Sequence, residues 1–250
     1  MGHNYQGWQL QPGVTTIQGM LEDKLQILCR APVRIHGAGR TDAGVHAWGQ
    51  VAHFHADTPM TTDRLRIALN GMLPMDVSVR ELEEVPLHFH ARFDAVGKTY
   101  RYEILARRSR SALLGRRSWQ VWDPLDEGAM AAALPALVGT HNFVAFQGAN
   151  SSVTHTVRTL TRVELGREPW DLLVFTVEGT GFLKHMVRSM VGTLVDIGLG
   201  RRPPEHMKYL VESGDRSAVG RTAPPHGLVL VKVHYAEAEK GGSSAQGEED

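Results

Sequence analysis

A run of small residues, Gly37–Ala47, sets a cation, a hydroxyl and a carboxylate side by side. The three groups belong to Arg40, Thr41 and Asp42. The glycines around them let another surface approach the backbone closely and permit turns with φ > 0. A carboxylate in this setting can act as a nucleophile or stabilise a charged sugar, and a guanidinium can stack on a base or bind phosphate. The alternative is a glycine-rich turn in which Asp42 caps the backbone and pairs with Arg40.

Two segments that alternate apolar and polar residues flank this run, Val33–His36 before it and Val51–His55 after it. The alternation predicts half-buried strands. A loop held between two strands is where a rigid scaffold presents reactive groups. We therefore expect Asp42 to be positioned by the strands on either side of its loop.

Two later elements carry further side chains of interest. Lys98–Ile104 alternates like a strand and holds Tyr100 and Tyr102, of which one is expected to be an ordinary core residue. Phe182–Leu199 has the apolar spacing of a helix, with Arg188 beside the apolar stripe. On this pattern alone, Arg188 is more readily a surface charge than an active-site group.

Four segments, in this order, resemble motifs of the tRNA pseudouridine synthase A family. They are Gly-Arg-Thr-Asp-Ala-Gly-Val-His-Ala at 39–47, Phe-His-Ala-Arg at 89–92, Tyr-Arg-Tyr at 100–102 and Gly-Thr-Gly-Phe-Leu-Lys-His-Met-Val-Arg at 179–188. The resemblance extends from about Tyr5 to Tyr235, nearly the whole chain. It implies an isomerase, an intramolecular transferase that converts uridine to pseudouridine at positions 38, 39 and 40 in the anticodon stem-loop of tRNA.

The resemblance also implies roles for individual residues. Asp42 takes the catalytic position, and Arg188 is placed against it in the active cleft. Tyr100 packs on the target base and takes part in removing the C5 proton. Arg40 fills the place in the stem that the flipped base vacates. The family needs no metal or organic cofactor, and its members are homodimers with one tRNA across both subunits. The full set expected to bind substrate is Arg40, Thr41, Tyr100, Lys184, Arg107, Arg108 and Arg110.

The reaction explains these residue types. The N1–C1′ bond must break, the base must rotate, and the sugar must rejoin it through C5. The target uridine must first leave the stack, at a cost of a few kcal/mol. An ionised carboxylate is needed, and a guanidinium beside it would favour that form. The sequence leaves open whether the intermediate is a C6 adduct, an acylal or a glycal.

The distribution of charge agrees with an RNA substrate, although the net charge of the 250 residues is zero. The segment from Glu237 to Asp250 holds five acids and one base, and the remainder holds 26 basic and 22 acidic residues. Arg101–Arg117 alone contains six arginines and one acid. Such a patch is typical of a phosphate-binding surface, and the alternative is a solvated arginine-rich loop.

Periodicity and caps predict a mixed α+β protein. We expect helices near 16–30, 62–73, 126–138 and 182–199, a short helix from Pro203, and strands at 77–82, 98–104, 119–122, 157–165, 172–178 and 228–233. We interpret them as two ferredoxin-like, RRM-like α/β sandwich domains that form the pseudouridine synthase fold with a basic cleft between them. The predicted divisions are 1–95, 96–236 and a disordered acidic tail at 237–250.

Composition disfavours several other classes of protein. Hydrophobic residues are 42% of the chain and charged residues 22%, as in ordinary globular proteins. We expect a cytoplasmic protein, because the sequence shows neither a membrane-spanning run nor a signal peptide. The single cysteine, Cys29, excludes a disulfide framework. The pairs His53/His55 and His88/His90 lack recognisable metal-ligand spacing, so no metal site is expected.

The start of the chain differs from the family pattern. Family members have an apolar strand before the segment that matches Asn4–Gln9, and almost nothing precedes that segment here. A late start codon or a missing strand would explain the difference, and a missing strand would leave a sheet edge unpaired. The latter motivates a rival hypothesis, a catalytically inactive tRNA- or RNA-binding protein on the same scaffold. A small-molecule hydrolase using Asp42 leaves the arginine patch unexplained.

Overall fold

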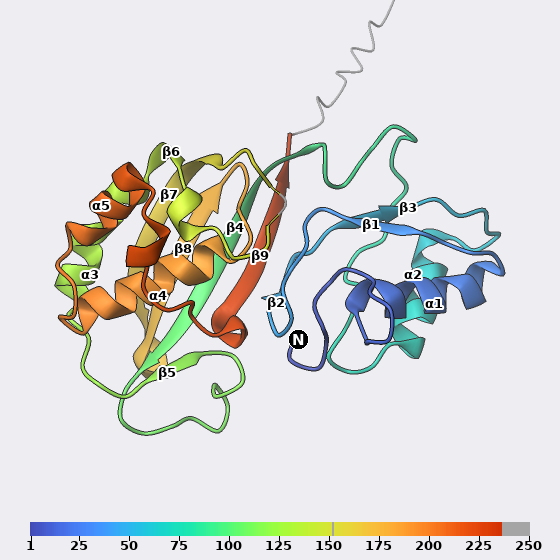
Figure 1. Cartoon of the computed structure of the whole chain (residues 1–250). Helices are drawn as coiled ribbons and strands as arrows, with labels where there is room; N and C mark the ends of the chain where they lie inside the picture. The colour runs from blue at the N-terminus through green and yellow to red at the C-terminus, as the bar shows by residue number, and fades with distance from the viewer. Residues whose placement is uncertain (152, 237–250) are drawn as a thin grey trace, which may run out of the picture.

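The computed structural model describes residues 1–151 and 153–236. Figure 1 shows two halves, which we call the N-terminal half (residues 1–94) and the C-terminal half (residues 95–236). They are connected through β2 (His46–Ala47), a short strand of the N-terminal half that pairs in parallel with β9 (Leu228–Tyr235) of the large sheet. The loop that carries Asp42 therefore lies where the two halves meet.

The N-terminal half packs two helices on a small sheet. Helix α1 (Ile17–Cys29) begins where the hydroxyl of Thr16 accepts a hydrogen bond from the backbone of Gly19, as predicted. Helix α2 (Thr62–Met72) follows the cap residue Thr61. Strands β1 (Ile35–Gly37) and β3 (Ala52–Phe54) pair antiparallel. Apolar side chains from all these elements form one core, which buries Trp8, Leu25, Val33, Ile35, Leu65 and Leu69.

The strand predicted at Val77–Leu82 is wrong. The backbone of Val79 donates to the side-chain oxygen of Asn70 at 2.7 Å and accepts from its amide nitrogen at 2.8 Å. One asparagine on α2 thus satisfies the groups that a neighbouring strand would have paired, and the alternating sequence is extended without joining a sheet.

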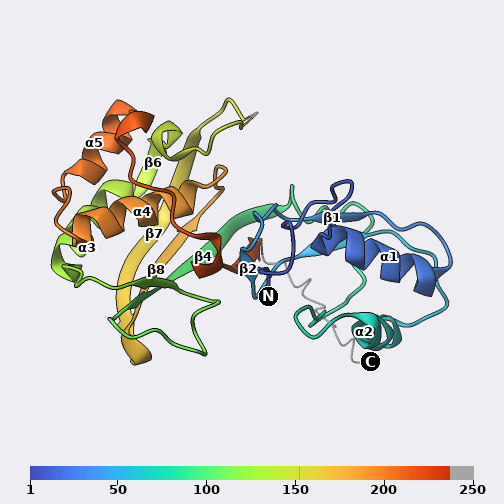
Figure 2. The same ribbon diagram turned by 60° about the horizontal axis from the view of Figure 1, so that its bottom comes forward.

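The C-terminal half is a large sheet with helices on one face (Figure 2). Its strand order is β2-β9-β4-β8-β7-β6, with β5 also paired to β4. The central strand β4 is antiparallel to both of its neighbours, β8 and β9. The further strands are β4 (Ala95–Ala106), β5 (Trp119–Val121), β6 (Gly139–Asn142), β7 (Val157–Glu168) and β8 (Leu172–Gly179). The helices are α3 (Glu127–Ala133), α4 (Met186–Gly198) and α5 (His206–Ser213).

Helix α4 begins later than the sequence predicts, at Met186 rather than Phe182. The residue before it, His185, has φ 61° and ψ 0°, a left-handed backbone conformation. A right-handed helix cannot continue through such a residue. Residues 182–185 consequently lead into the helix without being part of it, and the imidazole of His185 reaches Asp42 of the N-terminal half.

The predicted mixed α+β class is confirmed. The two halves are less alike than the pair of similar sandwiches expected, because the N-terminal sheet has two strands among the described residues and the other sheet has seven. The domain boundary at 95/96 stays a prediction, and the predicted acidic tail at 237–250 lies outside the described residues.

No helix within the described part of the chain is both long and apolar enough to span a membrane.

Candidate active site

The loop that carries Asp42 is anchored at several points. The backbone of Ala38 donates to Val51 at 2.7 Å, and the amide of Gln50 donates to Gly39 at 2.8 Å. Ala38 and Val45, on either side of Asp42, are buried in the core of the C-terminal half. The loop is therefore fixed to both strands beside it, as the flanking alternation predicts.

The first residues of the chain support the same loop. Trp8 donates a backbone hydrogen bond to the carbonyl of Thr41 at 3.1 Å. Gly7, next to it, has φ 85°, and a Cβ there would lie 2.5 Å from the Thr41 carbonyl oxygen. Only glycine allows this approach. The backbone of Gly2 donates to Nδ1 of His46 at 2.8 Å, which fixes the far end of the loop.

His46 also connects the loop to the arginine-rich segment. Its Nε2 lies 3.1 Å from the carbonyl oxygen of Arg116. Because Nδ1 accepts a hydrogen bond, Nε2 carries the proton and donates to Arg116. Burial lowers the pKa of His46, which favours this neutral form.

Two side chains from the start of α4 contact the carboxylate of Asp42. Nη1 of Arg188 lies 3.3 Å from Oδ2, and Nε2 of His185 lies 3.5 Å from the same oxygen. Among the described residues, no hydrogen bond reaches Oδ1. The Asp42 side chain is 32% exposed and that of Arg188 is 13% exposed. One carboxylate oxygen is thus held by the C-terminal half, and the other is free to approach a substrate.

Arg188 is itself fixed in place. Its Nε donates to the carbonyl of Ala223 at 2.8 Å, and the backbone of Ala223 donates back to the Arg188 carbonyl at 3.0 Å. This anchor uses one edge of the guanidinium and turns Nη1 toward Asp42. A surface charge would not be held in this way, so the structure favours the active-site interpretation of Arg188.

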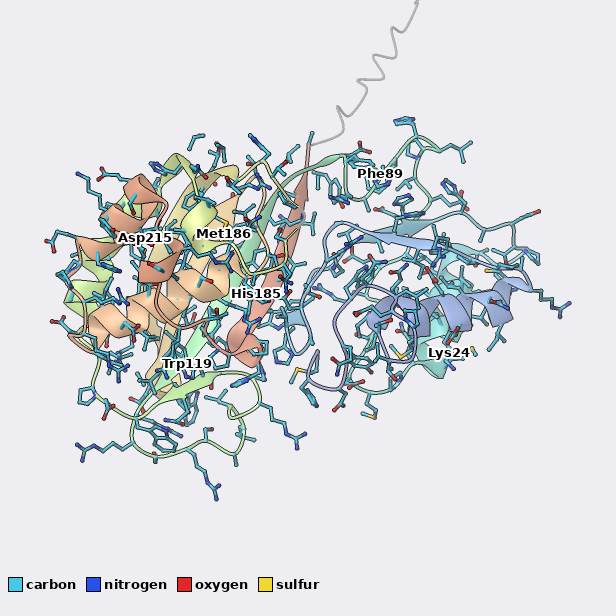
Figure 3. All side chains as sticks on the ribbon, viewed as in Figure 1. Lys24, Phe89, Trp119, His185, Met186 and Asp215 are labelled. Carbon is cyan, nitrogen blue, oxygen red and sulfur yellow. The ribbon has the colours of Figure 1, made fainter. Side chains whose placement is uncertain are left out.

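The position of His185 depends on its unusual backbone and on a close neighbour. Figure 3 labels it where α4 begins, on the side that faces the N-terminal half. A Cβ on Gly148 would lie 2.7 Å from Nδ1 of the imidazole, so the ring packs against bare backbone. Left-handed conformations of residues other than glycine are strained and cluster at functional sites. Here the strain directs the imidazole at Asp42.

His185 is neutral near pH 7. Burial lowers its pKa below the ordinary value of 6.5, and Arg188, Lys184 and Arg216 lower the pKa further, while Asp42 opposes them. The neutral ring can still donate its Nε2 proton to the carboxylate. Arg188 consequently supplies the positive charge at this site, and His185 supplies orientation.

Tyr100 closes the site from the sheet. It lies on β4 with 7% of its surface exposed, and its ring meets that of Phe182 edge to face at 4.9 Å between centroids. Burial raises the pKa of the Tyr100 phenol, and the charge of Asp42 raises it further. The hydroxyl therefore stays protonated. Tyr102 points into the core and donates to Pro224, so it is the ordinary core member of the pair.

The other predicted substrate-binding residues surround this centre in two groups. Arg40, Thr41 and Lys184 lie in the two segments that meet at Asp42, and the ammonium of Lys184 donates to the Ala149 carbonyl at 3.1 Å. The residues Arg107, Arg108 and Arg110 lie in the long loop between β4 and β5, at the bottom of Figure 1.

Not every arginine of the predicted patch is available to bind phosphate. Arg101 makes a two-point contact with Glu168 at 2.6 Å and a third contact with Glu103 at 3.0 Å. It is an internal ion pair of the sheet. Arg107 is partly engaged by Asp171 at 3.6 Å, whereas Arg108 and Arg110 are exposed.

A cavity of about 430 Å³ lies beside the site, and His185, which contacts Asp42, is one of the residues that line it. Its lining includes His185 and Arg216, neither of which the sequence analysis assigned to the site. His185 stands next to Lys184 in a quoted motif, which was the available signal. Arg216 had none, because only the tertiary fold brings the segment after α5 to the start of α4.

Within the described ranges 1–151 and 153–236, no three His, Cys, Asp or Glu side chains are grouped so that they could hold a metal ion. The side chains around Asp42 are suited to binding an anionic substrate and to chemistry at a carboxylate.

Comparisons with known proteins point to one family. A family model described as tRNA pseudouridine synthase matches residues 1–94 and 133–236. Asp42 and Arg188 fall inside these segments, whereas Tyr100 and the β4–β5 loop fall between them.

Curated relatives extend the match over the whole chain. A tRNA pseudouridine synthase A from Myxococcus xanthus is 44% identical over 252 residues, which cover 100% of this chain and 95% of that protein. The proteins of the same name from Citrifermentans bemidjiense and Acetivibrio thermocellus are 45% and 44% identical. Each of these two matches covers 94% of this chain, and the shares of the relatives covered are 94% and 96%.

Proposed function

The chain belongs to the tRNA pseudouridine synthase family, and we propose that it isomerises uridine to pseudouridine in tRNA. The observation that carries this proposal is the contact between Asp42 of one half and Arg188 and His185 of the other. The reaction needs a positioned carboxylate with one free oxygen, and this contact holds Oδ2 while it leaves Oδ1 free.

We assign the reacting group to Oδ1 of Asp42. Arg188 and His185 hold Oδ2, so Oδ1 can approach the target nucleotide without losing a hydrogen bond. The guanidinium and the neutral imidazole both contact Oδ2 and so fix the rotation of the carboxylate. After the N1–C1′ bond breaks, the base rotates and C5 bonds to C1′; C5 then loses its proton and N1 gains one, so the reaction is a net isomerisation.

Tyr100 is assigned to packing against the target base. Its ring is buried beside Asp42 and stacks edge to face with Phe182, so it forms one wall of the site. Because its hydroxyl stays protonated, a part in removing the C5 proton requires the phenol to pass its own proton on at the same time.

Arg40 is exposed, two residues before Asp42 in the same loop. We propose that its planar guanidinium enters the space left in the stem when the uridine flips out. We assign Thr41, next to Arg40 in the loop, and Lys184, next to His185, to substrate contacts near Asp42, and Arg107, Arg108 and Arg110 would bind phosphates farther along the RNA.

We further propose that the targets are uridines 38, 39 and 40 of the anticodon stem-loop and that two copies of the chain bind one tRNA in the cytoplasm. Both statements follow from the family resemblance.

The test is to incubate an unmodified tRNA transcript, with uridines at 38–40 and elsewhere, with the purified protein and to map pseudouridine by position. We expect conversion confined to 38–40 and lost with Asp42→Ala. Tight tRNA binding without conversion would instead support the inactive binding protein.

A further inference from the structure

The cavity behind His185 has a basic lining. It is bounded by Gly148, Lys184, His185, Ser189, Arg216 and Thr222, together with neighbouring residues. Lys184 and Arg216 bring two positive charges to it, and no carboxylate is among the residues that line it. Cavities with charges of one sign concentrate ligands of the opposite sign.

The carboxylates nearest in the chain are engaged elsewhere. Asp42 faces the other side of His185 and contacts Arg188. Asp196 pairs with Arg201 at 3.2 Å. Asp215, the neighbour of Arg216, accepts hydrogen bonds from the backbone and hydroxyl of Ser217 and from a tyrosine. None of them neutralises the cavity.

The cations of the cavity, in contrast, are available. Within the described part of the chain, no acidic side chain lies within ion-pair distance of Arg216, and Lys184 contacts only the carbonyl of Ala149. Ser189 is 5% exposed, and its side chain forms no hydrogen bond to a described residue. Ser189 lines the cavity, and its hydroxyl is free to donate to a ligand there. Two cations and one hydroxyl donor can together bind one phosphate group.

We propose that this cavity binds the phosphodiester group next to the target uridine, with Arg216, Lys184 and Ser189 as its ligands. The inference rests on the proposed function, because Asp42 must be the site where the uridine reacts. His185 both lines the cavity and contacts that carboxylate at 3.5 Å. The cavity is therefore next to the place where the sugar would react, and the phosphate adjoining that sugar is the anionic group of the substrate that would lie nearest to it.

The two sites would then act together. The phosphate bound by Arg216 would fix the backbone of the flipped nucleotide, and the position of the sugar relative to Oδ1 would follow. His185 contacts both regions, yet its neutral ring adds no charge to the cavity. The subsite should therefore show itself in substrate binding more than in the chemical step.

The experiment uses synthetic anticodon stem-loop RNA with one target uridine. Neutral methylphosphonate replaces the phosphodiester either 5′ or 3′ of that uridine, and KM and kcat are measured for wild type and Arg216→Ala. On all-phosphate RNA we expect Arg216→Ala to raise KM about 10- to 100-fold. For wild type, one of the two neutral linkages should raise KM by a similar factor. For Arg216→Ala, the same linkage should raise KM by less than about a further twofold, because the contact is already missing.

Arg64→Ala is the matched control, because it removes an exposed arginine from α2 in the other half. The factor by which Arg64→Ala changes KM should be the same on the neutral RNA as on all-phosphate RNA, so the two effects multiply. Ser189→Ala keeps both positive charges and should raise KM less than Arg216→Ala does. It replaces Arg216→Ala in the experiment if that variant does not fold. The proposed subsite would be overturned if the effect of Arg216→Ala (or of Ser189→Ala) on KM multiplied in full with the effect of each neutral linkage, as it does for the control. If wild type converts no uridine on any RNA, the proposed function itself fails.

Discussion

Replacing Arg188 by methionine tests whether the charge at Asp42 comes from the start of α4. Methionine keeps much of the length and packing of arginine and removes the guanidinium. The contact with Oδ2 at 3.3 Å is lost, and so is the anchor to Ala223 at 2.8 Å. Asp42 retains only the neutral His185 as a partner, so its free oxygen becomes less ordered and its charge is unbalanced.

The magnitude follows from the kind of contact removed. A hydrogen bond between charged groups contributes about 1.5–3 kcal/mol. The distance of 3.3 Å is long for such a bond, and Asp42 is 32% exposed, so a value near the lower end, about 2 kcal/mol, is appropriate. Since about 1.4 kcal/mol corresponds to a factor of ten, kcat should fall about 30-fold. Loss of the anchor should also lower stability by about 1 kcal/mol.

The assay is single-turnover conversion of a saturating anticodon stem-loop RNA, with Tm measured in parallel to separate rate from stability. Arg167→Met is the control, since it removes an arginine of β7 whose partner is Glu127 of α3 and not Asp42. We expect the control to stay within about twofold of wild type. A rate for Arg188→Met equal to that of the control would refute the assigned role.

Three further predictions concern His185 and its neighbour Gly148. His185→Leu should lower kcat about tenfold, and His185→Gln should recover most of it because its amide can donate to Asp42. Burial lowers the pKa of His185, so the ring takes up a proton only at a pH below the ordinary range of histidine. Wild-type kcat should fall as pH drops below that range, and a pH–rate profile of His185→Gln that kept the same step would contradict this. Gly148→Ala would place a Cβ 2.7 Å from the imidazole and should lower kcat to the level of His185→Leu, as single-turnover assays of the two variants would show.

Local sequence signals predicted the elements that position the site. The hydroxyl of Thr16 and the proline at 32 bound α1 closely, and the alternation around Tyr100 and along 172–178 and 228–233 matches β4, β8 and β9. In each case the cause is local, a cap or a period of two. The loop at Asp42 was also interpretable, because its small residues and flanking strands are contiguous.

The features that sequence reasoning missed depend on distant contacts. Val77–Leu82 has the pattern of a strand, yet Asn70 satisfies the backbone of Val79 instead. The start of α4 is set by the left-handed backbone of His185 packed against Gly148, 37 residues earlier. The engagement of Arg101 by Glu168 was equally hidden, since the pairing of β7 with β8 brings Glu168 close.

In the candidate site, the residues within motifs were predictable and those brought in by distant contacts were not. The family motifs brought Asp42 and Arg188 into one hypothesis, and the structure places them 3.3 Å apart. Arg216 follows a short helix and carries no motif, so only the fold relates it to the cavity.

The most direct test of the account is single-turnover pseudouridine formation by Asp42→Asn, with tRNA binding measured on the same preparation. Asparagine keeps the size of the side chain and removes the charge that Arg188 and His185 hold. We predict tRNA binding within about threefold of wild type and no detectable pseudouridine at positions 38–40. Pseudouridine formed by Asp42→Asn at a rate near that of wild type would contradict the central claim that this carboxylate carries the reaction.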